Sequence, residues 1–425
     1  MAFVGVFMLK RIAGGYRWLV WFLASSFVFY KYILEVSPGV LGHHMMSYYH
    51  STGFGLGNLI AAYFYAYMLM QLPIGMILDR LGPKRVVSAC LLLCVFGTLL
   101  MAYAPYYSVA FIARFITGLG AAAAVLGCIK LISIWFPQSH FAMLVGLMMT
   151  IGMLGAVSGD AVVQYCLQYY QWQHLIALIA WLGLILLLVF FIAVSDKKAP
   201  YSTVNNPEIP NLWQGLKQVG LNKKSWILSV YSGLMFAPIS AFSGAWGVPF
   251  LHNALHFSLS DSANMMSLIF YGFAIGAPLW GWLSDLWNKR KVFLWMATLS
   301  SLLFSFCIIY VPGLSLWIEG LLLFLFGFTI SSFVVSFTMI REVNPLILTA
   351  TATGFMNAFN SISSAQIDTW IGYLLDKHWT GALEQGQRIY SLHSYYIGMS
   401  IVPLVILFAL IMLPFVSETH WKSGK

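Results

Sequence analysis

The stretch from Gln71 to Arg85, QLPIGMILDRLGPKR, decides the fold of this chain. An apolar run ends there in Asp-Arg, a Gly-Pro turn and a basic pair, and another apolar run begins at Val86. Gly-Pro cannot continue a regular helix, and each charge left in hydrocarbon costs about 2.5–3.5 kcal/mol. The stretch therefore predicts that one helix leaves a membrane, that the turn lies in water at its surface, and that the next helix enters.

The composition of the whole chain agrees with this interpretation. Hydrophobic residues make up 60% of the 425 residues and charged residues only 8%, so the composition excludes a soluble globular protein. The apolar runs predict twelve membrane spans of about 20 residues or more, enough to cross a bilayer. We expect the first at about 18–38, the fourth at about 109–136 and the tenth at about 316–340.

The net charge of +9 is a signal of topology. With twelve spans, Lys377 and Arg388 are the only basic residues placed on one side of the membrane, and all other loop and terminal Lys and Arg residues fall on the opposite side. An excess of basic residues marks the cytoplasmic side, so both termini are predicted to be cytoplasmic. The lipid bilayer, and no nucleic acid, is the expected partner of this charge.

The pattern of the first turn occurs a second time, about half the chain length later. Gly281-xxx-Asp285 again ends an apolar run, and basic residues again follow. A parallel duplication of six-helix halves predicts such a repeat. The first gating motif consists of Gly75, Asp79, Arg80, Gly82, Lys84 and Arg85, and the second of Gly281, Asp285, Lys289 and Arg290.

The repeated motif resembles the loop between helices 2 and 3 of the major facilitator superfamily of secondary transporters. The resemblance implies an all-α integral membrane fold with 12 transmembrane helices in two pseudo-symmetric six-helix bundles. It also implies that helices 1, 4, 7 and 10 line a central cavity, and that the motif around Asp79 helps to close the cytoplasmic side. The expected parts are a cytoplasmic N-terminus (1–17), a first bundle (18–194), a cytoplasmic linker (195–225), a second bundle (226–416) and a cytoplasmic tail (417–425).

Charged residues at membrane depth in the first half are candidates for the substrate and ion pathway, because burying a charge there is costly. Lys31 and Glu35 are four residues apart on the first span and share a helix face, so they can pair with each other or with another helix. Arg114 precedes Gly118 and Gly120 in a pattern that resembles the family's helix 4 motif, in which the arginine is linked to coupling. Lys130, on the same span, either faces the cavity or extends to the cytoplasmic surface.

The second half contributes polar and aromatic candidates. Trp246 belongs to a stripe near the outer end of span 7, and span 11 is unusually polar for a helix that faces lipid. The candidates on span 11 are Asn357, Asn360, Gln366 and Asp368. Glu35, Asp160 or Asp368 would take a proton if transport is coupled to protons, and the sequence leaves this choice open.

These residues predict a proton-coupled carrier in the cell inner membrane that takes up a small organic anion by alternating access. A carboxylate, an amino acid or peptide, and a carboxylate siderophore are the candidate substrate classes. Export of a metabolite, siderophore or drug by proton antiport is the alternative, followed by a channel or a membrane-embedded enzyme. We expect a monomer that is not an enzyme, without a cofactor or metal ion, because the sequence has no phosphate-binding loop and no cluster of metal ligands.

Overall fold

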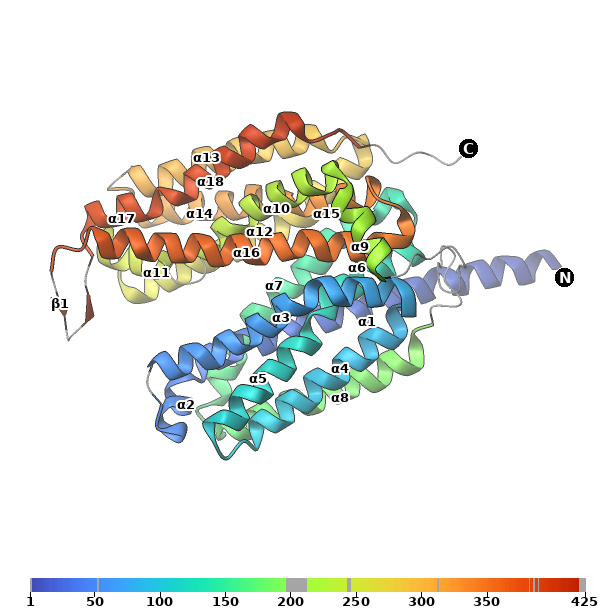
Figure 1. Cartoon of the computed structure of the whole chain (residues 1–425), viewed down its shortest axis with the longest axis horizontal. Helices are drawn as coiled ribbons and strands as arrows, with labels where there is room; N and C mark the ends of the chain where they lie inside the picture. The colour runs from blue at the N-terminus through green and yellow to red at the C-terminus, as the bar shows by residue number, and fades with distance from the viewer. Residues whose placement is uncertain are drawn as a thin grey trace. The chain divides into compact units, whose positions relative to one another are not determined.

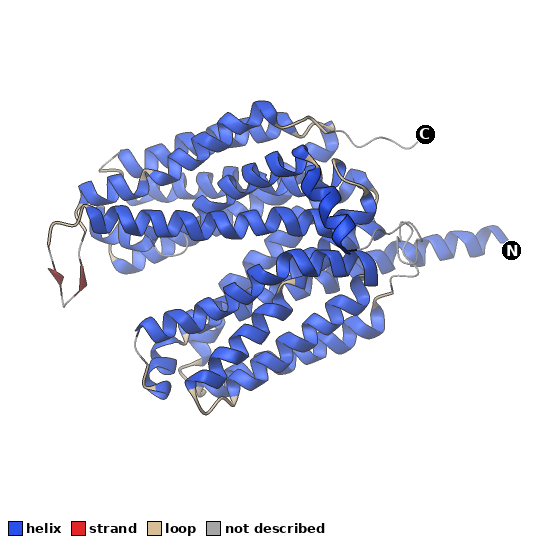
Figure 2. Ribbon diagram, viewed as in Figure 1, coloured by secondary structure: helices blue, strands red, loops and turns tan. Residues whose placement is uncertain are grey.

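The protein is almost entirely helical in the computed structural model, which describes residues 2–51, 53–195, 212–242, 246–311, 313–381, 383–384, 387–388 and 390–419 (Figure 2). The two short strands among these residues, β1 (Leu383–Glu384) and β2 (Gln387–Arg388), form an antiparallel hairpin. Most of the predicted linker, the last six residues and the side chain of Asp160 lie outside the described part.

The chain divides into two compact units. The first comprises Met1–Gln138, Ile151–Val219 and Pro345–Gly354, and the second comprises Ser139–Thr150, Gly220–Asn344 and Phe355–Lys425. Two long helices, both labelled in Figure 1, have residues in both units: α7 (Phe141–Cys166) begins in the second unit, and α16 (Thr349–Lys377) begins in the first.

The first unit is built on small residues that let helix backbones touch. Its other elements are α1 (Ala2–Val40), α2 (Gly42–Tyr49), α3 (Gly53–Leu81), α4 (Pro83–Ala102), α5 (Tyr107–Ala121), α6 (Ala123–Trp135), α8 (Trp172–Ala193), most of α9 (Leu212–Leu221) and η6 (Leu346–Leu348). Gly118 of α5 lies against the backbone of Tyr63 on α3, and Gly155 of α7 lies against the backbone of Phe29 on α1. Any larger residue at these positions would separate the helices, as expected for helix packing in a membrane.

The second unit uses the same kind of contact. It contains η1 (Gln138–His140, from Ser139 on), α10 (Lys223–Ala241), α11 (Gly247–Pro249), η4 (Phe250–Ala254), α12 (Leu259–Trp287), α13 (Lys291–Tyr310), α14 (Leu316–Ile330), η5 (Ser331–Val334), α15 (Val335–Glu342), α17 (Leu392–Met399), α18 (Ile401–Met412) and η7 (Leu413–Phe415). α12 packs along α14, where Gly272 meets the backbone of Phe324 and Gly327 meets that of Ile269.

Within the described residues, ten helices are long and apolar enough to cross a membrane. α10 and α16 have the length but not the apolar composition. The predicted all-α integral membrane fold is confirmed, and the chain is a multi-pass membrane protein.

The apolar spans Gly15–Pro38, Tyr107–Trp135 and Leu316–Glu342 agree with the first, fourth and tenth predicted spans. The structure adds that helix α1 as a whole begins at Ala2, and that a short helix α2, which was not predicted, follows it. The fourth and tenth spans, predicted as single helices, are each interrupted after 15 residues, between α5 and α6 and at η5. At η5 the Ser331 hydroxyl donates to the carbonyl of Phe328 at 2.7 Å, and such side-chain bonds compete with the regular helix pattern.

Candidate functional site

Helices α1, α3 and α5 bring five predicted or interacting side chains together inside the first unit. We call this set, Lys31, Glu35, Tyr63, Tyr67 and Arg114, the cationic cluster. Lys31 forms an ion pair with Glu35 one helical turn away, which is one of the two arrangements that their spacing allows. The Lys31 ammonium also lies over aromatic rings, 5.1 Å from the centre of Tyr67.

Arg114 is held by one edge of its guanidinium group. Its Nη1 donates to the carbonyl of Leu34 at 2.8 Å, and the group lies 4.7 Å from the ring centre of Tyr63. The Tyr63 hydroxyl in turn donates to Glu35 at 3.5 Å. The contacts with Tyr63 therefore connect Arg114 to the ion pair on α1.

The opposite edge of the same guanidinium group has no hydrogen-bond partner among the described residues. Both Nε and Nη2 of Arg114 are buried without an acceptor, and the residue is only 3% exposed. These two N–H groups lie in the guanidinium plane along one edge, in the geometry that receives the two oxygens of a carboxylate. Because unpaired buried donors are costly, this edge has the form of an anion-binding site.

The charges of the cationic cluster do not cancel. Lys31 and Arg114 supply two positive charges, and Glu35 supplies one negative charge. Lys31 is 4% exposed, whereas the Glu35 side chain is 20% exposed, so the carboxylate is the part of the ion pair that water reaches more readily. An excess cation buried this deeply favours a negatively charged ligand.

The first gating motif forms a second buried cluster in the same unit. Asp79 is 2% exposed and accepts a bond from Lys130 at 2.7 Å. It also accepts the backbone N–H of Ala350 at 3.1 Å, and both the N–H and the hydroxyl of Thr351 at 2.7 Å. Asp79 thus binds the free N–H groups at the start of α16, where the helix dipole also favours a negative charge.

The remaining residues of the first gating motif have different positions. Gly75 lies against the backbone of Ala350, so a side chain there would push the start of α16 away. Gly82 has a positive φ of 82° immediately before Pro83, which begins α4. Lys84 lies 5.0 Å from the ring centre of Phe191. Arg80 and Arg85 are exposed.

The structure places Lys130 with the gating motif and not beside Lys31. The sequence left two positions open for Lys130, the cavity and the cytoplasmic surface. Its ion pair with the buried carboxylate of Asp79 was not predicted. Its ammonium also donates to the carbonyl of Ile347 at 3.4 Å, next to the start of α16. Lys130 therefore shares the surroundings of Asp79.

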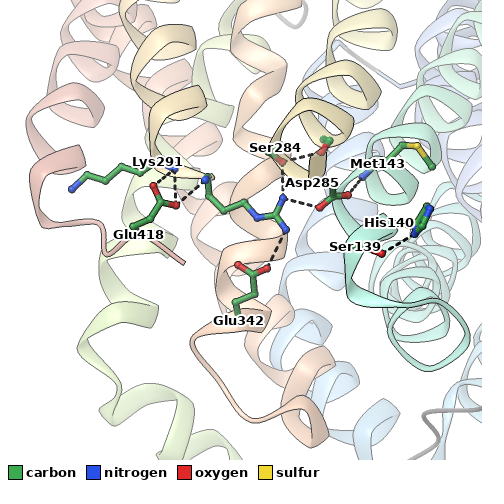
Figure 3. Close-up of polar contacts among 10 residues, drawn as sticks. Ser139, His140, Met143, Ser284, Asp285, Lys291, Glu342 and Glu418 are labelled. Atoms are coloured by element: carbon green, nitrogen blue, oxygen red, sulfur yellow. Dashed lines mark hydrogen bonds and ion pairs between the residues drawn. The ribbon is translucent and has the colours of Figure 1, made fainter. Parts of the chain in front are cut away.

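The second gating motif repeats this arrangement in the second unit (Figure 3). Asp285 accepts the backbone N–H of Met143, near the start of α7, at 3.1 Å. Arg290, fully buried, binds Asp285 at 2.7 Å and Glu342 at 3.1 Å. Gly281 lies against the backbone of Ala142, whereas Lys289 is exposed. Each motif therefore uses an aspartate to bind the first turn of a helix that changes unit along its length.

Glu418 joins the second cluster from the C-terminal segment and was not predicted. Its carboxylate accepts the backbone N–H of Arg290 at 2.7 Å and that of Lys291 at 3.2 Å, at the start of α13 (Figure 3). A signal existed in the sequence, because Val-Ser followed by an acid ends both halves, at 194–196 and at 416–418. Asp196 itself lies outside the described residues.

Glu418→Ala is expected to lower the free energy of unfolding by roughly 1–2 kcal/mol, because two N–H groups at the start of α13 lose their charged acceptor. Thermal unfolding of the purified protein measures this. The neighbouring Ser417→Ala variant serves as the control, with an expected change within roughly 0.5 kcal/mol. Equal melting temperatures for both variants would contradict a stabilising role for Glu418.

The predicted residues of the second half lie on α16, except for Trp246, which directly precedes α11. Trp246 donates its indole N–H to the carbonyl of Asp368 at 3.2 Å, so these two candidates lie together. Asn360 is buried, and its Oδ1 has no partner among the described residues. Asn357 is half-buried, and Gln366 lies on the exposed side of the helix.

Comparison with known proteins gives a consistent result. The family model described as Major Facilitator Superfamily matches residues 18–367. The probable galactarate/D-glucarate transporter GudP of Escherichia coli (strain K12) is 23% identical, over 93% of this chain and 94% of its own. The 4-hydroxybenzoate transporter PcaK of Acinetobacter baylyi is 25% identical, over 65% of this chain and 67% of its own.

Among solved structures, this chain resembles the transporter FucP in its outward conformation. The TM-score is 0.73 at 15% sequence identity, and the match covers 94% of this chain and 99% of that one. At this identity the likeness concerns the fold alone. It confirms the predicted twelve-helix architecture.

Proposed function

Because this chain belongs to the major facilitator superfamily, and is therefore a transporter and not an enzyme, we propose that it takes up a small organic anion together with protons. The single observation that carries the proposal is the free edge of Arg114, buried in the same cluster as a second cation, Lys31. The protein acts by alternating access as a monomer in the cell inner membrane, with both termini in the cytoplasm.

The substrate carboxylate binds the Nε and Nη2 groups of Arg114. A bidentate pair of this kind is stronger and more directional than a contact with a single ammonium group, because two parallel bonds fix the plane of the carboxylate. The names of the relatives support this substrate class, since galactarate, D-glucarate and 4-hydroxybenzoate are all organic anions.

Protonation of Glu35 couples the proton to the anion. In the ionised form Glu35 neutralises Lys31, and in the protonated form it releases Lys31 to attract the substrate. Loading a proton therefore raises the positive charge of the cationic cluster before the anion arrives. Loss of the proton restores the ion pair and weakens anion binding, which promotes release.

The two gating motifs control the helices that change unit. Asp79 binds the start of α16 and Asp285 binds the start of α7. Breaking these bonds frees each helix start from its unit, as required when the cytoplasmic side opens. Positive charge at the cytoplasmic surface comes from Arg80, Lys84 and Arg85 of the first motif and from Lys289 of the second.

A binding screen followed by transport in reconstituted vesicles tests the proposal. Organic anions such as D-glucarate and 4-hydroxybenzoate should raise the melting temperature, since a ligand of the folded form stabilises it. Their uncharged amide or alcohol analogues should not. Stabilisation by uncharged compounds alone would contradict an anion carrier.

Direction is measured with the same vesicles. Uptake driven by an imposed inward proton gradient supports symport. Accumulation that requires the opposite gradient would favour the alternative, export by proton antiport.

Glu35→Gln is expected to lower accumulation driven by a proton gradient strongly while retaining exchange of internal for external substrate. Glutamine resembles the protonated carboxyl group, so Lys31 stays free and the anion still binds, but position 35 can release no proton. The ratio of gradient-driven uptake to exchange measures this. Asp261→Asn, which removes a half-buried acid at the start of α12, is the control. Normal gradient-driven uptake by Glu35→Gln would remove Glu35 from the coupling step.

A further inference from the structure

Glu319 is a buried acid in a membrane-spanning helix that none of the clusters above uses. It lies in the first turn of α14, within the span Leu316–Glu342, and is 1% exposed. Neither of its carboxylate oxygens has a hydrogen-bond partner among the described residues. The ion pairs found in the described part of the chain do not include it.

The face of α14 on which Glu319 lies is otherwise apolar. Leu323, Phe326 and Ile330 follow it at intervals of three or four residues, and all three are fully buried. Phe326 packs edge-on against Phe242 at the end of α10. The adjacent Gly320 faces Leu268 of α12. Glu319 is therefore a buried carboxyl group on a helix face whose other members are hydrocarbon side chains.

The ionisable groups on the helices that pack most closely against α14 form no bond with Glu319. They are Lys223, Lys224 and Tyr231 on α10, Asp261, Tyr271 and Asp285 on α12, and Lys291, Cys307 and Tyr310 on α13. The partners found for these groups lie elsewhere: Tyr231 bonds Thr298, Asp285 bonds Arg290, Asp261 bonds Ser258, Lys291 bonds Pro414 and Tyr310 bonds Tyr396.

A carboxylate in such surroundings needs a cation or a proton. No nearby cation neutralises it in the described residues, and a metal ion would need several further oxygen ligands, which the apolar face of α14 does not supply. A proton needs no other ligand. The neutral acid is the form that an apolar site accepts.

We propose that Glu319 is a proton-binding site in the second unit, separate from Glu35, that loads and releases one proton in each transport cycle. This inference rests on the proposed proton-coupled function. In the loaded form the carboxyl group is neutral. Release occurs when the start of α14 is exposed to water, and the proton leaves to bulk water as the carboxylate forms.

Infrared difference spectroscopy of the purified protein tests the proton without any substrate. The wild type should show a carboxylic acid carbonyl band at neutral pH that is reversibly lost at alkaline pH. Glu319→Gln should lack this band. Glu319→Asp, which keeps a titratable group, and Asp261→Asn should retain it. A spectrum identical in the wild type and Glu319→Gln would overturn the proposal.

The number of protons moved per anion tests the transport step. In vesicles with D-glucarate or 4-hydroxybenzoate as the probe, whichever is transported, Glu319→Gln should move one proton fewer per anion than the wild type. An unchanged ratio would overturn the proposal, because Glu319 would then hold its proton permanently. If neither probe is transported, the proposed function fails, and the loss of the acid band at alkaline pH still decides whether Glu319 exchanges a proton.

Discussion

Arg114→Ala is expected to weaken binding of the organic anion about 100-fold and to abolish its transport. Two charge-assisted hydrogen bonds to the substrate carboxylate are lost, which together are worth roughly 3 kcal/mol. Arg114→Lys should recover little of this, since a lysine keeps the charge but cannot form the bidentate pair. Titration calorimetry of the purified protein with the best ligand from the screen measures the loss.

The control for Arg114 is Arg17→Lys. Arg17 also lies over an aromatic ring, 5.4 Å from the ring centre of Phe136, but it belongs to no predicted site. We expect the Arg17→Lys variant to bind the anion with the same affinity as the wild type. If Arg114→Lys binds the anion as tightly as the wild type, the free edge of Arg114 is not the carboxylate site.

Asp79→Ala is expected to lower the free energy of unfolding by roughly 3–5 kcal/mol, the largest stability effect that we predict. The change removes the carboxylate partner of buried Lys130 and leaves the first N–H groups of α16 without their acceptor. Lys130→Met should cost less, because Asp79 keeps the N–H groups and the Thr351 hydroxyl as donors. Thermal and denaturant unfolding of the purified variants compare the two.

The double variant Asp79→Ala with Lys130→Met separates the two causes. It removes the uncompensated cation, so it should be more stable than Asp79→Ala alone while still lacking the bonds to α16. Arg80→Ala, a change at an exposed neighbour, is the control and should unfold like the wild type. Equal stability of Asp79→Ala and the wild type would show that the contact with α16 contributes nothing.

The sequence predicts what depends on local spacing. The apolar runs predicted twelve spans, and the four-residue interval between Lys31 and Glu35 predicted that they can pair. Both features follow from helix geometry over a few turns, and the repeat of Gly-xxx-Asp predicted two related halves. The polar face of α16 was equally visible, because its residues lie within one helix.

Partners that are distant in the sequence could not be predicted in this way. Nothing in the spacing of Asp79 indicates that Lys130 or the start of α16 contacts it, since these contacts depend on how the helices pack. Glu319 was missed for a different reason. An acid in the first turn of a helix is an ordinary stabilising feature, and only its complete burial distinguishes it.

α16 is long enough to cross a bilayer but too polar to enter one unaided. Asp368 alone would cost about 2.5–3.5 kcal/mol at the centre of an isolated helix, and the amides add to this. During synthesis the helix must therefore wait for neighbours that are already inserted and can accept its polar groups. Asp79, made long before α16, accepts the first N–H groups and the Thr351 hydroxyl of this helix, so we expect assembly of the last part of the chain to depend on the folding of the first.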